Sequence, residues 1–118
     1  PLVSTVNTFT KTQSVTPSVL TSTAASVAID ASLSNNFTHI LTEDTTLSAP
    51  SNLVDGTAYN FIIKQNASAA KTLAFDAAFL FPDGVDPTIT TTLNGKMLLS
   101  SIYTSVGGLM CVSAQTFQ

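Results

Sequence analysis

Short strand-like runs separated by turn signals fill the segment 46–105, and this alternation constrains the fold more than any other feature. The clearest run is Thr57–Gln65, in which large apolar side chains recur at every second position. Turn dipeptides such as Asp55–Gly56 and Asn94–Gly95 bound the runs. Strands repeating at roughly ten-residue spacing are typical of sandwiches and barrels. The sequence therefore predicts an all-β domain, a β-sandwich or jelly-roll-like fold of about eight strands.

Further strands are expected on both sides of this run. Ser26–Asp30 is expected to be a first strand with Val27 and Ile29 facing inward, and Phe37–Glu43 is a second candidate. The remaining expectations are a hairpin partner of the 57–65 run at Thr72–Phe75, a strand at Thr88–Leu93, and a closing hairpin of Lys96–Ser105 with Leu109–Phe117 through Val106-Gly107-Gly108. Converting Gly108 to Val is expected to weaken that closing turn.

Charge is scarce, and this excludes some functions. Charged residues make up 9% of the chain, against roughly 25% in ordinary soluble domains. The four cations are scattered lysines, Lys11, Lys64, Lys71 and Lys96, and the net charge is −3. Nucleic-acid binding requires clustered cations, so it is not expected. No apolar run approaches the ~20 residues of a membrane helix, and no signal peptide is recognisable.

The first 25 residues differ from the rest. Pro1–Ala25 contains one charge, Lys11, and Pro17 disfavours a helix across it. Its apolar residues are too sparse to offset the entropy of ordering an isolated segment. One interpretation is an extended arm that orders on a neighbouring subunit, and the other is an edge strand with a loose terminus. The arm, residues 1–25, would precede a β-sandwich domain at 26–118. The candidate contact residues of the arm are Leu2, Val3, Val6, Phe9, Val15, Val19 and Leu20.

Candidate chemical groups are few, and each has a structural interpretation. His39 is the single histidine, and no G-x-S-x-G elbow accompanies it, so we interpret it as a core or face residue. Cys111 lies in an apolar strand pattern and is expected to be a buried, inert thiol. The acidic pairs Glu43–Asp44 and Asp83–Asp86 fit solvated turns better than a calcium site. We therefore expect no catalytic residue, metal or cofactor, and no enzymatic activity.

A series of short motifs follows the strand pattern in a fixed order. It consists of Thr46-Leu47, Pro50-x-Asn52-Leu53-x-x-Gly56, Ile63-Lys64-Gln65-Asn66, Thr72-Leu73-Ala74-Phe75, Phe81-Pro82-x-Gly84, Pro87-Thr88-Ile89 and Asn94. The series resembles a β-domain of tailed-phage virion proteins, at tail-fibre ends and in capsid-associated proteins. The chain departs from that pattern at Asn66, where an acidic residue is common, at Phe75, where Trp is common, and at Asp83, where Gly is common.

The resemblance implies a virion structural protein, and two placements stay open. The first is a capsid decoration or cement protein that binds the major capsid protein on the capsid surface and stabilises the shell. The second is a tail-fibre or receptor-binding module that recognises a host surface glycan or protein. A mean hydropathy of +0.35 with so little charge favours a surface that is covered by copies of the chain itself or by a partner. In the decoration placement the chain is expected to be a homo-oligomer, a trimer. A lone cysteine suits synthesis in the reducing cytoplasm of a bacterial host.

Overall fold

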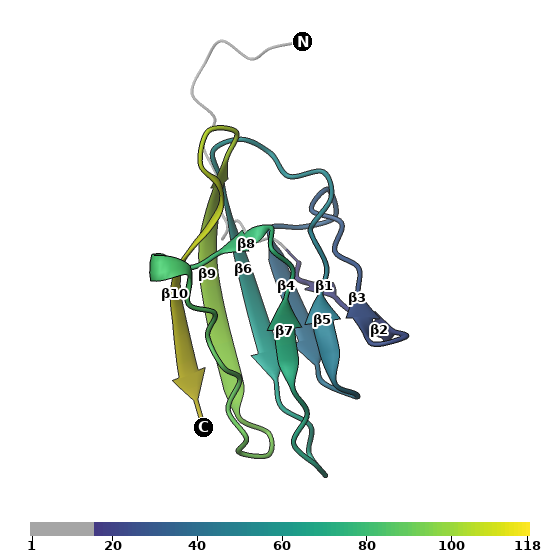
Figure 1. Cartoon of the computed structure of the whole chain (residues 1–118). Coiled ribbons are helices and arrows are strands. Elements are labelled where there is room, and N and C mark those ends of the chain that lie inside the picture. Colours follow the sequence, from purple (N-terminus) through teal and green to yellow (C-terminus); the bar gives the residue numbers. More distant parts are fainter. Residues whose placement is uncertain (1–15) are drawn as a thin grey trace, which may run out of the picture.

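Two β-sheets form the part of the chain that the computed structural model describes, residues 16–118 (Figure 1). The large sheet has the order β1-β4-β6-β9-β10-β8, with β1 Ser18–Val19, β4 Asn36–Ile40, β6 Thr57–Lys64, β9 Lys96–Thr104, β10 Gly108–Phe117 and β8 Phe79–Leu80. The small sheet has the order β2-β3-β5-β7, with β2 Ser22–Thr23, β3 Ser26–Val27, β5 Thr45–Leu47 and β7 Leu73–Phe75. A 3-10 turn, η1 (Pro82–Gly84), follows β8. The expected all-β fold is confirmed.

The chain winds between the sheets in stacked coils. It passes from β4 in the large sheet to β5 in the small sheet and returns as β6, so that β1, β4 and β6 are parallel, as are β3, β5 and β7. Parallel neighbours require a crossover connection, and here the strand of the opposite sheet supplies it. Jelly rolls are antiparallel, so the jelly-roll part of the sequence prediction is not confirmed.

Because neighbouring coils stack in register, side chains of the same kind lie next to one another on adjacent strands. Phe37 and Phe61 are partners in the parallel register of β4 and β6, and their rings stack with centroids 5.2 Å apart. On the opposite face of the same strands, Asn60 Nδ2 donates to Asn36 Oδ1 at 3.1 Å. Phe79 extends this aromatic contact, because its ring and the ring of Phe61 meet edge to face with their centroids 5.7 Å apart. The core is therefore a continuous column that links both sheets.

The face assignments made from alternation are correct. The inward-facing side chains of β6, namely Tyr59, Phe61 and Ile63, are fully buried. Val27 and Ile29 are buried, and Phe37, His39 and Leu41 form the buried face of the β4 region. The inward face expected for Val27 and Ile29 is thus confirmed, and the alternating large apolar residues of the 57–65 run form the buried side of β6.

Two expected elements are wrong. β7 does not form a hairpin with β6 but joins the small sheet beside β5, and the segment 88–93 forms no strand. The fully buried amide of Gln65 holds the two connecting segments beside the end of β6. Its Oε1 accepts from the backbone N–H groups of Asn66 and Lys71, and its Nε2 donates to the carbonyls of Lys71 and Thr90. Four backbone groups of these segments are therefore satisfied by one side chain rather than by a strand ladder.

The closing hairpin of β9 and β10 is confirmed, and Gly108 in its turn has a backbone conformation that favours glycine. Gly108 has φ +79, and an added Cβ would lie 3.1 Å from Leu80 Cδ1. We expect Gly108→Val to lower the free energy of unfolding by about 2 kcal/mol, because a β-branched residue is strained at positive φ. Urea unfolding followed by circular dichroism measures this. Val106→Ala is the control, since Val106 in the same turn is 98% exposed; equal effects of both substitutions would contradict the register.

The second half of the expected arm belongs to the two sheets. β1 pairs with β4, Leu20 N donates to Thr38 O at 2.7 Å, and the Leu20 side chain is buried. β2 and β3 form a small hairpin in the other sheet. Five of the expected contact residues, Leu2, Val3, Val6, Phe9 and Val15, lie outside the described residues. Any arm that projects from this domain therefore precedes β1.

Candidate interaction surface

The outer face of the large sheet carries many exposed apolar side chains, interrupted by one row that is polar throughout. We define it by the side chains that alternate with the buried ones, and the strand register arranges them in four rows. From the hairpin end downwards the rows are Ala58, Ile102, Met110 and Leu80; Asn36, Asn60, Ser100 and Ser113; Val19, Thr38, Ile62, Leu98 and Gln115; and Ile40, Lys64, Lys96 and Phe117. A bulge at Val112 adds one more exposed apolar side chain.

Apolar exposure is concentrated on this face. Eight of the thirteen exposed large hydrophobic residues in the described part of the chain belong to strands of the large sheet. Ile40 is 58% exposed, although it lies within a strand. The outward residues of the small sheet are instead small or polar, namely Ser26, Thr46 and Ala74. Exposed apolar side chains that gather on one face of a sheet favour an interaction site there.

Charge is placed only at the ends of the outer face. Lys64 and Lys96 are directly opposite each other in the β6–β9 register, in the lowest row. Like charges in such a pair repel. Asp55 lies beyond the opposite end of β6, where its Oδ1 accepts from Ser105 N at 3.0 Å. One end of the face is therefore positive and the other negative.

Two hollows lie on this face. One, of about 290 Å³, is lined by Val19, Ile40, Ile62 and the two lysines of the lowest row, among others. The other, of about 370 Å³, lies where Leu80 and Pro82 meet Met110 and Val112. Both are lined mainly by apolar atoms, so they suit apolar side chains better than a polar ligand.

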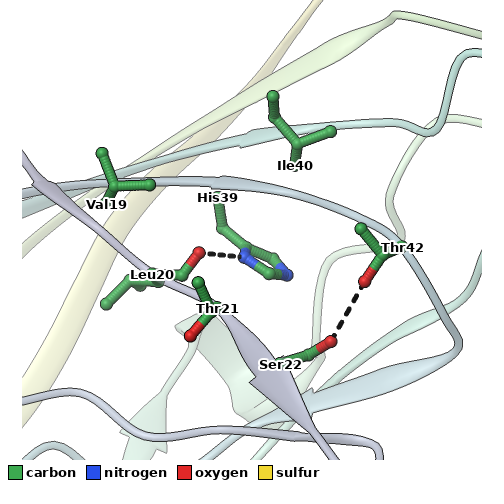
Figure 2. A pocket seen from close by; sticks show the side chains of 7 residues that line it. All are labelled: Val19, Leu20, Thr21, Ser22, His39, Ile40 and Thr42. Carbon is green, nitrogen blue, oxygen red and sulfur yellow. Dashed lines mark hydrogen bonds between the residues drawn. The ribbon is translucent and has the colours of Figure 1, made fainter.

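His39 joins the first coil to the second (Figure 2). Its Nδ1 lies 2.8 Å from Leu20 O, and a carbonyl can only accept, so Nδ1 carries the proton. Its Nε2 is buried and has no hydrogen-bond partner among the described residues. The ring also lines a hollow of about 390 Å³ beside Ser22 and Thr42. The hydroxyl of Ser22 donates to Glu43 Oε2 at 2.8 Å. The expected core position of His39 is confirmed.

Cys111 is a buried residue of β10. Desolvation, with a smaller contribution from Asp86, raises the pKa of its thiol to about 12. The thiolate is the reactive form, so we expect Cys111 to resist labelling by a maleimide at pH 8 in the folded protein. In urea the ordinary pKa returns and labelling becomes fast. Mass spectrometry of both samples measures this, and equal labelling rates would contradict the burial. Because burial raises the pKa of the folded thiol, stability is expected to fall as pH rises above 9.0, the ordinary pKa of a cysteine.

The structure separates the two expected contact residues that it describes. Val19 is 75% exposed on the outer face, whereas Leu20 lies in the core. Ile62 and Ile102 are exposed on this face and were not predicted as surface residues. Both alternate with buried positions in β6 and β9, so the alternation contained the signal.

Neither the described residues nor known proteins point to a specific ligand for this chain. Among residues 16–118, no group of three or more His, Cys, Asp or Glu side chains could hold a metal. No helix in the same range has the length and apolar character needed to cross a membrane. No family model, curated protein or solved structure matches this chain at a significant level. The resemblance to phage virion proteins therefore stays a prediction from the motifs.

Proposed function

We propose that this chain is a non-enzymatic structural subunit of a phage virion, a decoration or cement protein that binds the major capsid protein and stabilises the shell. The observation that supports this best is the apolar outer face of the large sheet. A domain with 9% charged residues and such a face is suited to cover its surface with protein partners. The motif series at Thr46 to Asn94 supports the virion assignment.

Binding to an assembled shell would stabilise it by mass action. A subunit that binds the lattice but not free capsid protein shifts the equilibrium towards the lattice. The segment before β1 contributes the arm in this proposal, by strand addition or burial of its apolar residues.

Copy number tests the proposal. Quantitative mass spectrometry of purified virions is expected to find this chain in numbers comparable to the major capsid protein. A handful of copies per particle would contradict the decoration role and favour the tail-fibre placement. Absence from the virion would contradict both placements.

Removing residues 1–15 tests the arm. The cut precedes β1, so the truncated chain is expected to fold and to keep its thermal midpoint. Its binding to empty capsids is expected to weaken at least about tenfold, as contacts worth more than ~1.4 kcal/mol are lost. A cut at residue 23 is unsuitable because it removes the buried Leu20. Undiminished occupancy by the truncated chain would show that the arm does not bind the shell.

A further inference from the structure

We propose that the outer face of the large sheet packs on the same face of a second copy of this chain, with the strands of the two copies antiparallel across a two-fold axis. The proposal rests on the geometry and charge of this face and does not depend on the virion role. The occupant of this face is a second copy of the chain, and it binds with its strands inverted.

The size of the face fits a pair of copies. The 36 residues of the six strands, at about 4.8 Å by 3.3 Å for each residue, give a projected area of about 570 Å². Standard interfaces bury about 800 Å² of accessible surface on each partner, and protruding side chains raise the accessible area above the projection. A twisted sheet also packs well on another sheet, as in sandwiches. The face is therefore large enough for a stable self-contact.

The placement of charge selects the antiparallel orientation. Lys64 and Lys96 lie in the lowest row, and Asp55 lies beyond the uppermost row. The two rows are about 20 Å apart along β6. When one copy is inverted on the other, the lysines of each copy lie over the Asp55 end of its partner. Both ends of the interface then carry opposite charges, and the like-charged lysine pair gains a counter-charge.

The parallel alternative is unfavourable for the same reason. A three-fold assembly with its axis along the strands would bring Lys64 and Lys96 of all copies to one level. Their mutual repulsion would have no acidic group of this face to offset it. The face thus favours a dimer over the trimer expected for a decoration protein.

A carboxylate introduced into the interface is expected to prevent dimerisation. Analytical ultracentrifugation of the full chain is expected to give a dimer at micromolar concentration. Ile62→Asp and Ile102→Asp are expected to give monomers with unchanged circular dichroism, because each buries a carboxylate in an apolar contact. Ala74→Asp is the matched control on the outward side of the small sheet and is expected to stay dimeric.

A mixing experiment tests the orientation. The double variant Lys64→Glu, Lys96→Glu and the single variant Asp55→Lys are each expected to dimerise about tenfold more weakly than the wild type. In the antiparallel pair, mixing the two variants makes both ends attractive again. The mixture is therefore expected to recover wild-type affinity as a heterodimer.

The outcomes separate this proposal from its rivals. A monomeric wild type, a trimer, or a dimer that survives Ile62→Asp and Ile102→Asp would overturn it. Failure of the charge variants to recover affinity on mixing would overturn the antiparallel orientation. None of these results bears on virion copy number, so the proposed function can fail or stand separately.

Discussion

Gln65→Leu is expected to lower the free energy of unfolding by about 4 kcal/mol, since each unpaired buried polar group costs about 1–3 kcal/mol. The substitution leaves four backbone groups without their partner: the N–H groups of Asn66 and Lys71 and the carbonyls of Lys71 and Thr90. Leucine has a similar volume, so the loss reports hydrogen bonding rather than a cavity. Urea unfolding followed by circular dichroism measures it.

Gln65→Glu separates the two halves of this network. The remaining carboxylate oxygen can still accept from the two N–H groups, but the second oxygen faces two carbonyls and cannot donate. We expect a large loss at pH 7 that shrinks at low pH, because a protonated carboxyl recovers one donor. A loss below about 1 kcal/mol in Gln65→Leu would mean that water replaces the amide fully.

Phe61→Ala is expected to cost about 4 kcal/mol, within the range for large-to-small core changes. The Phe61 ring is fully buried, stacks on Phe37 and meets the edge of Phe79, so its removal interrupts the aromatic column. Phe61→Leu retains most of the apolar volume and is the matched control, expected to cost about 1 kcal/mol. Equal losses in both variants would show that ring geometry, not volume, sets the cost.

Local sequence patterns predicted which side chains of the 57–65 run are buried, and they predicted the hairpin of β9 and β10. Alternation in the 57–65 run identified Tyr59, Phe61 and Ile63 as core. The Val106-Gly107-Gly108 turn identified β9 and β10, because a short turn between two apolar runs leaves few alternatives. The same alternation could have identified Ile62 as a surface residue.

Strand partners were less predictable than strand faces. The short segment between β6 and β7 fits a hairpin, yet β7 pairs with β5, because parallel pairing depends on contacts far apart in sequence. Nothing local distinguishes Gln65 from a solvent-exposed glutamine at the end of a strand. The charge pattern across the outer face was also hidden, since Lys64 and Lys96 become neighbours only through the β6–β9 register.

Part of this domain is a linear stack of coils, in which each coil contributes a strand to each sheet. Each coil contacts mainly the coils before and after it, as in a solenoid, so stability is shared between neighbours rather than spread evenly. β1 is an edge strand of the large sheet and pairs only with β4 in the described chain. Terminal repeats of such stacks open before the interior does, and their amide hydrogens exchange first. The end of the stack that bears the N-terminal segment is thus the part of the fold most readily reshaped by a partner.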